Sequence, residues 1–190
     1  MDELKQHFKA TFSPYEIQLL HYMYLCFIYE WSKFILMLVF FTLFHMQKDF
    51  IVEVIILLSI RNFFGGLHFK KYCSCFLFTF IFISSGLLLS RFYIIGSSFQ
   101  IFILVVALLT SYFIKPIVSS NRTALSQKQQ QIYHTCGMAI LLLYLLLFIT
   151  LKTFPYSNIC FWIIVLQTLQ LIVAKILTKG GEKSKWNQSL

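Results

Sequence analysis

The residues best suited to chemistry lie in one polar stretch between two apolar segments of the chain. A histidine beside a cysteine can act as a general base, because the imidazole takes the thiol proton and leaves a nucleophilic thiolate. Without such a base, a thiol with an ordinary pKa of about 8.5 is only a few per cent ionised at neutral pH. The stretch supplies His68 and Cys75 for attack on a peptide carbonyl, and it reads Arg61-Asn62-Phe63-Phe64-Gly65-Gly66-Leu67-His68-Phe69-Lys70-Lys71-Tyr72-Cys73-Ser74-Cys75.

The spacing of this pair predicts a local break in helical structure. In an unbroken helix, residues seven positions apart share a face but lie about 10 Å apart along the axis. Hydrogen-bonded catalytic partners need about 3 Å. Gly65 and Gly66 precede His68 and permit unusual backbone angles and close approach. We therefore predict that the helix is interrupted near residues 65–72.

Other residues could support the pair. Glu53 or Asn62 could orient His68 as a third member of the site. Arg61 could hold a substrate carboxylate or stabilise an oxyanion, and it could equally be a positive anchor at the membrane edge.

Three simpler interpretations compete with catalysis. A lone histidine at a membrane edge is ordinary, and a lone cysteine in an apolar helix is usually a small apolar residue. Polar residues within apolar segments, such as Glu30, Lys33 and Glu53, could instead mark the path of a transporter or channel, although Glu30 and Lys33 lie one turn apart and could simply pair. A zinc site is the third alternative, and it would need ligands from His68, Cys73 and Cys75 together with His134 or Cys136.

The composition indicates an integral membrane protein. Of 190 residues, 58% are hydrophobic and 12% are charged, whereas a soluble domain is about half apolar and about a quarter charged. The net charge of +9 fits loops that face anionic lipid better than it fits nucleic acid, because no basic arm is present. The five cysteines are odd in number and three of them lie in or beside apolar stretches, so we expect reduced thiols rather than a disulfide framework.

The chain divides into a single membrane-embedded domain at 1–178 and a polar, mobile tail at 179–190. Within the domain, residues 1–15 carry one apolar face and predict an amphipathic helix in the membrane interface. A full span needs about 20 residues, so the apolar segments predict an all-α protein with six transmembrane helices, or four helices plus a re-entrant hairpin made by the second and third segments. The expected segments are 17–44, 50–60 (or to 67), 74–90, 92–114, 136–151 and 156–177, with a polar loop at 115–135.

The distribution of positive charge predicts the topology. With six spans and the N-terminus inside, the inner segments carry twelve lysines and arginines and the outer loops carry three. Cytoplasmic segments are the positive ones, so we expect both termini in the cytoplasm.

The residues of the polar stretch resemble a known family signature. Arg61, Gly65, Gly66, His68 and Cys75 form the pattern Arg-x-x-x-Gly-Gly-x-His with a cysteine seven residues after the histidine. This pattern is similar to that of accessory gene regulator B (AgrB) proteins. Chain length, the order of apolar segments and the charged N-terminus also resemble that family.

The resemblance implies a function. AgrB proteins are membrane cysteine endopeptidases that remove the C-terminal part of a propeptide, AgrD, through an acyl-enzyme thioester. A cysteine or serine of the propeptide then captures the acyl group to give a cyclic thiolactone or lactone, which becomes a quorum-sensing signal. By position, Cys75 would be the nucleophile, His68 the general base and acid, and Cys73 a neighbour.

The same resemblance implies the surroundings of the enzyme. It suggests a homodimer in the bacterial plasma membrane, in contact with lipid, with its active site at the cytoplasmic face and with no metal or other cofactor. The resemblance also implies propeptides with an amphipathic leader followed by an acidic tail. Lys70 and Lys71 are candidates for binding that tail, because their positive charge would attract it.

Overall fold

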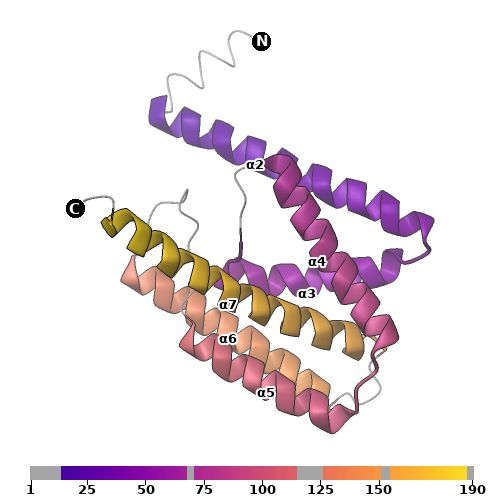
Figure 1. Cartoon of the computed structure of the whole chain (residues 1–190). Helices are drawn as coiled ribbons and strands as arrows, with labels where there is room; N and C mark the ends of the chain where they lie inside the picture. The colour runs from indigo at the N-terminus through magenta and orange to yellow at the C-terminus, as the bar shows by residue number, and fades with distance from the viewer. Residues whose placement is uncertain (1–13, 68–70, 115–125, 151–154, 188–190) are drawn as a thin grey trace. The chain divides into compact units, whose positions relative to one another are not determined.

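The computed structural model describes residues 14–67, 71–114, 126–150 and 155–187, and in this part of the chain every regular element is an α-helix (Figure 1). The predicted all-α class is therefore confirmed. The predicted interfacial helix at 1–15 lies outside the described residues, apart from the two residues that begin the first helix. The helices are α2 (Pro14–Leu43), α3 (Gln47–Phe64), α4 (Tyr72–Phe92), α5 (Ser97–Phe113), α6 (Gln127–Thr150) and α7 (Ser157–Asn187).

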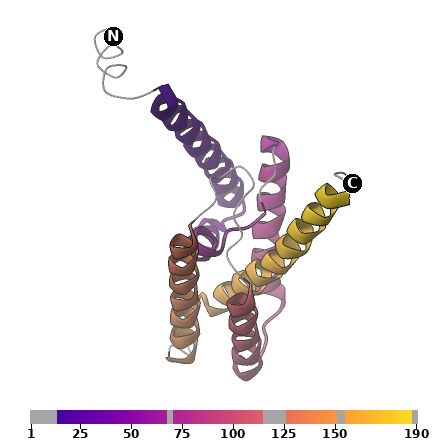
Figure 2. The ribbon, with the colours of Figure 1, turned by 90° about the vertical axis from the view of Figure 1, so that its left-hand side faces the viewer.

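The chain forms two compact units. The first spans Met1–His45 and contains α2, whereas the second spans Met46–Leu190 and contains the other five helices. Within the second unit, α7, drawn in orange to yellow in Figure 2, packs against α3, α4 and α5, and α3 packs against α4 and α6 as well.

In the described part of the chain, four helices are long and apolar enough to cross a membrane. They are α2 over Glu16–Leu43, α4, α6, and α7 over Ser157–Leu177. Their outward side chains are mostly large and apolar, which suits contact with lipid. The two helices that fall short are α3, which has 18 residues and four charged side chains, and α5, which has 17 residues. In the predicted alternative with four spans, the segments that correspond to α3 and α4 form a re-entrant hairpin. In the structure, α4 by itself is long enough to span the membrane.

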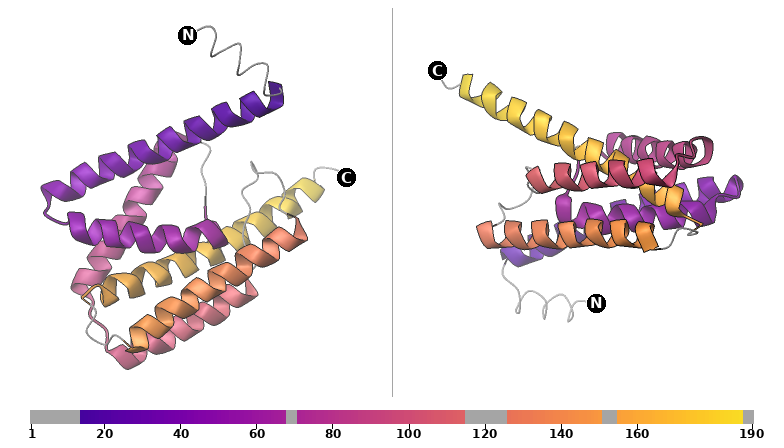
Figure 3. Two further views of the ribbon diagram at one scale, coloured as in Figure 1. Left: turned by 180° about the vertical axis from the view of Figure 1, so that it is seen from behind. Right: turned by 90° about the horizontal axis from the view of Figure 1, so that it is seen from below.

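Side-chain contacts fix the directions of the five helices in the second unit. Ser59 bonds to Tyr144 at 2.9 Å while Phe64 meets Gly137, so α3 and α6 are antiparallel. Val52 of α3 and Cys160 of α7 line one pocket, and Gln167 donates to the Gly65 carbonyl at the C-terminal end of α3, so α3 and α7 run in the same direction. Consecutive helices thus alternate, and α5 packs against both α6 and α7 (Figure 3). We call the end that holds the α3–α4 loop and the starts of α4 and α6 the loop end.

The opposite end of this unit is held by one asparagine. The Asn158 side chain donates to the carbonyls of Ser90 and Tyr93, at the end of α4, and accepts from Gln100 of α5 at 3.0 Å. Trp162 donates to the same Tyr93 carbonyl at 3.1 Å. These hydrogen bonds between polar groups fasten the end of α4 and the start of α5 to α7.

Several helix boundaries differ from those predicted. Helix α6 begins at Gln127, not near residue 136, because Ser126 and Gln129 form a capping box: the Gln129 N–H donates to the serine hydroxyl at 3.3 Å and the Ser126 N–H donates to the glutamine side chain at 3.0 Å. Glutamine is also a good helix former. Helix α5 is shorter than the predicted segment because residues 93–96 are not helical. Helix α7 continues to Asn187, into the segment expected to be a mobile tail.

Gly86 provides a test of the packing between α3 and α4. A Cβ atom at this position would clash with Oε1 of Glu53, whose side chain is fully buried, so the carboxyl group would have to shift within the core. Overpacking a core costs about 1–3 kcal/mol, which outweighs the gain of about 1 kcal/mol in helix propensity. We expect Gly86→Ala to lower the thermal unfolding temperature in detergent, and Glu53→Ala to relieve the loss in the double variant. Gly96→Ala, which meets no atom within 4 Å, is the control. An unfolding temperature for Gly86→Ala equal to that of the wild type would contradict this packing.

Candidate active site

The loop after α3 begins with a glycine that no other residue could replace without strain. Gly65 has φ 77° and ψ −158°, a conformation open essentially to glycine alone, and its N–H donates to the Arg61 carbonyl at 2.9 Å. Residues 65–67 are not helical and α4 begins at Tyr72. The helix break predicted from the glycine pair is therefore confirmed in the described residues.

Helix α7 holds this loop from across the bundle. The Gln167 side chain donates from Nε2 to the Gly65 carbonyl at 3.0 Å. The next residue, Gly66, is buried, and a Cβ atom added there would lie 3.0 Å from Nε2 of Gln170 and 3.2 Å from Nε of Arg61. At residue 66, glycine is thus needed because an amide and a guanidinium approach the backbone closely. It is not needed for an unusual backbone angle.

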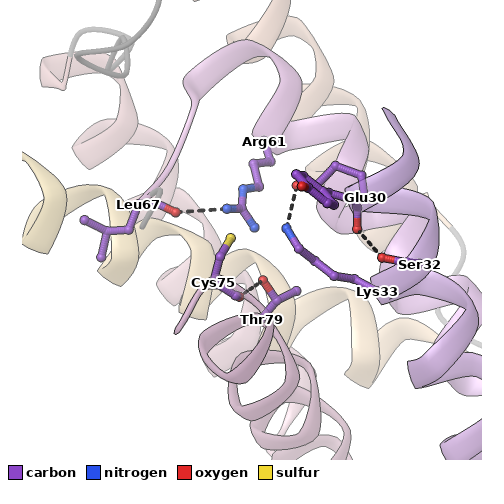
Figure 4. Close-up of polar contacts among 8 residues, drawn as sticks. Glu30, Ser32, Lys33, Arg61, Leu67, Cys75 and Thr79 are labelled. Carbon is purple, nitrogen blue, oxygen red and sulfur yellow. Dashed lines mark hydrogen bonds and ion pairs between the residues drawn. The ribbon is translucent and has the colours of Figure 1, made fainter. Parts of the chain in front are cut away.

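Arg61 braces the other side of the loop. Its Nη2 donates to the Leu67 carbonyl at 3.0 Å, so the guanidinium spans the turn from the last helical residues of α3 to the residue before His68 (Figure 4). This contact gives Arg61 a role in loop geometry. The roles expected for it toward a substrate carboxylate or an oxyanion stay predictions.

Cys75 and Cys73 lie in different surroundings although they are two residues apart. Cys75 is in the first turn of α4 with 7% of its surface exposed, whereas Cys73 is exposed, because a helix turns by about 200° over two residues. In Figure 4 the Cys75 sulfur points to the side on which Arg61 lies, and the Cys75 carbonyl accepts from Thr79 at 2.9 Å. The thiol that the family pattern selects is therefore the one inside the bundle.

The predicted base is not among the described residues. His68 and Lys70 lie outside them, and Lys71, which precedes α4, is exposed. The distance from imidazole to thiol stays a prediction. The structure describes both ends of the segment that would carry His68, from Gly65 to Leu67 and from Lys71 to Cys75.

The two candidates for a third catalytic member occupy different places. Glu53 is fully buried against Gly86, which is eleven residues beyond Cys75 on α4 and thus about 16 Å along the helix. Asn62 is exposed near the end of α3. Their roles toward His68 stay predictions, and the position of Asn62 beside the loop favours it over Glu53.

Two other polar groups have local partners. In α2, Lys33 forms an ion pair with Glu30 at 2.7 Å, drawn as a dashed line in Figure 4, as expected for residues one turn apart. In α6, His134 lies with Nε2 3.4 Å from the Ser111 carbonyl and with its ring against Phe64. The residues described here contain no group of three or more histidine, cysteine or acidic side chains placed to hold a metal.

The structure adds two residues that the sequence analysis missed, Gln167 and Gln170. Both are buried, at 1% and 5% exposure, in the most buried of the candidate spans. A signal was available, because polar residues within a membrane helix usually face the bundle interior. Nothing in the sequence, however, says which loop they would meet.

Comparison with known proteins identifies the family of the chain. The family model described as accessory gene regulator B matches residues 2–171, which is most of the chain. Neither the search of curated proteins nor the search of solved structures gave a match. With its apolar helices and this match, the chain belongs to the accessory gene regulator B (AgrB) family of membrane proteins, which take part in processing the autoinducer of that system.

Proposed function

We propose that the chain is a membrane cysteine endopeptidase that cleaves the C-terminal part from an AgrD-type propeptide, with Cys75 as nucleophile and His68 as general base. One observation carries this: the buried thiol lies at the start of α4, at the loop end, where the turn that leads into His68 is fixed by Arg61 and Gln167. Held turns of this kind restrict where a catalytic side chain can go, which is how a protein positions reacting groups.

The chemistry follows from a thiolate in this position. The His68 imidazole takes the Cys75 proton, and the sulfur adds to the scissile carbonyl while the carbonyl π electrons move to oxygen. The oxyanion collapses, the C–N bond breaks, and the imidazolium proton goes to the departing amine of the C-terminal part. An acyl thioester remains on Cys75. A cysteine or serine of the propeptide displaces the enzyme sulfur, which closes a thiolactone or lactone ring and restores the thiol.

The charge at the loop end supports an acidic substrate segment. In the second unit, six lysines and arginines have side chains that the structure describes, and four of them lie at this end: Arg61, Lys71, Lys128 and Lys175. Only Lys48 and Arg91 of this set lie at the opposite end. We propose that the loop end faces the cytoplasm, where positive loops belong, and that Lys70 and Lys71 help to attract an acidic propeptide tail. The homodimer that the family resemblance suggests stays part of this proposal.

Trapping the acyl-enzyme tests the mechanism. When the chain is mixed in proteoliposomes with a propeptide whose internal cysteine and serine residues are replaced by alanine, we expect the thioester to accumulate, because no internal nucleophile can displace the sulfur. Mass spectrometry should show the N-terminal part of the propeptide attached to the peptide that contains Cys75, and hydroxylamine should release it. Two outcomes would contradict the proposal. One is a stable adduct on Cys73, and the other is a Cys75→Ala protein that forms no adduct and still gives the wild-type amount of cleavage product.

A further inference from the structure

The Gln170 side chain is buried in the bundle with no hydrogen-bond partner among the described residues. Its exposure is 5%, and neither its carbonyl oxygen nor its amide nitrogen makes a hydrogen bond. A buried amide that lacks a partner destabilises a fold, because it has lost its bonds to water and gained none in return. Such a group is better explained by a partner that arrives during function than by a role in folding.

Two other buried glutamines show what a structural role looks like. Gln167, one turn earlier on α7, donates to the Gly65 carbonyl at 3.0 Å. Gln100, at the opposite end of the bundle, donates to Asn158 at 3.0 Å. Both fasten one segment to another through an amide hydrogen bond. Gln170 makes no such bond to any residue that the structure describes, although it is as deeply buried as they are.

The Gln170 amide lies against the loop that precedes His68. Its Nε2 lies 3.0 Å from the point where a Cβ atom of residue 66 would be, and Nε of Arg61 lies 3.2 Å from the same point. The Gln170 amide from α7 and the Arg61 guanidinium from α3 thus both pack against the face of Gly66 that carries no side chain. In Figure 4 the Cys75 sulfur points to the side on which Arg61 lies.

We propose that the Gln170 amide donates a hydrogen bond to the oxyanion formed when Cys75 adds to the scissile carbonyl. This rests on the proposed function, and it makes Gln170 a catalytic residue of that reaction. In the step, the S–C bond forms and the carbonyl π pair moves onto oxygen, where the amide N–H meets the new negative charge. When the C–N bond breaks, the pair returns to the carbonyl and the hydrogen bond weakens. A donor already placed in a site without water stabilises this charge strongly, because it does not have to reorganise.

The decisive variant is Gln170→Met, which keeps the size of the side chain and removes the donor. We expect cleavage of an AgrD-type propeptide to fall by about 10²–10³-fold, the usual cost of losing one oxyanion donor. We expect the thermal unfolding temperature in detergent to stay the same or rise, since no hydrogen bond is lost. Gln100→Met is the matched control: it breaks a structural bond, so its unfolding temperature should fall while its cleavage rate per folded molecule is unchanged.

A second reagent separates this role from the activation of the thiol. Alkylation of Cys75 by iodoacetamide needs the thiolate but forms no oxyanion, so its rate, followed by mass spectrometry of the Cys75 peptide, should be the same in Gln170→Met and wild type. Gln170→Glu, which loses the donor when ionised, should also cleave poorly and still be alkylated.

The outcomes distinguish failure of this inference from failure of the proposed function. Wild-type cleavage by Gln170→Met overturns the role of Gln170 and leaves Cys75 untouched. Cleavage and alkylation that fall together, with a lower unfolding temperature, show a structural glutamine and also overturn it. Full cleavage by Cys75→Ala instead removes the proposed nucleophile itself.

Discussion

Replacing Cys75 with alanine is expected to lower propeptide cleavage by about 10⁴-fold or more, because the proposed nucleophile, which would form the acyl-enzyme, is lost. The Cys75 side chain is small and its thiol makes no disulfide, so the variant should insert and fold normally. His68→Ala should be almost as inactive, because nucleophile and base act as a unit. Cleavage in membranes, normalised to the amount of inserted protein, is the measurement.

Cys73→Ala is the matched control for this loss. It removes an exposed thiol two residues away in the same turn of α4 and should keep most of the activity. The reverse pattern, with Cys73→Ala inactive and Cys75→Ala active, would show that the exposed thiol is the nucleophile and that the family pattern was assigned to the wrong cysteine.

Replacing Gly65 with alanine is expected to reduce cleavage by about 10²-fold or more. At φ 77° and ψ −158°, a side chain forces the backbone out of its conformation, which moves the turn leading into His68. A displacement of about 1 Å at a catalytic group can cost 10²-fold in rate. The Gly65 carbonyl would also turn away from Gln167, so the unfolding temperature should fall as well.

Gly66→Ala should have a smaller effect of a different kind. Gly65 is the one described glycine with positive φ, so alanine at residue 66 is strained only by its contacts, at 3.0 Å and 3.2 Å from Gln170 and Arg61. We expect a partial loss of cleavage with little change in unfolding temperature. For Gly65→Ala, the control is Gly96→Ala. If Gly65→Ala cleaves as fast as the wild type, or no more slowly than Gly96→Ala does, the turn does not position the base.

Local patterns in the sequence predicted much of the fold. A chain segment in lipid must satisfy its own backbone hydrogen bonds, so a long apolar run predicts a helix. All six predicted segments contain a helix. The glycine pair predicted the break after α3 because only glycine adopts the angles found at Gly65. The early start of α6 was also readable, because Ser126 and Gln129 have the spacing of a capping box, but the glutamine run was interpreted as a loop.

The candidate site was harder to predict because part of it comes from distant segments. Gln167 contacts Gly65 across 102 residues of sequence, and no local pattern pairs one helix with another at that distance. Glu53 was one of two candidates to orient His68, and its role stays a prediction: eight residues of helix place it about 12 Å from Arg61 along the axis, and it packs against Gly86. Sequence proximity predicts neighbours within a helix turn, whereas packing between helices decides the rest.

The bond between Gln167 and Gly65 has a consequence for biosynthesis. A ribosome adds about 5–20 residues each second, so the 102 residues that separate the two partners take roughly 5–20 s to synthesise. During that interval Cys75 has already been made, but the turn beside it still lacks its clamp from the last helix. A nascent or truncated polypeptide that stops before α7 would thus carry the proposed nucleophile without the hydrogen bond that holds the turn beside it.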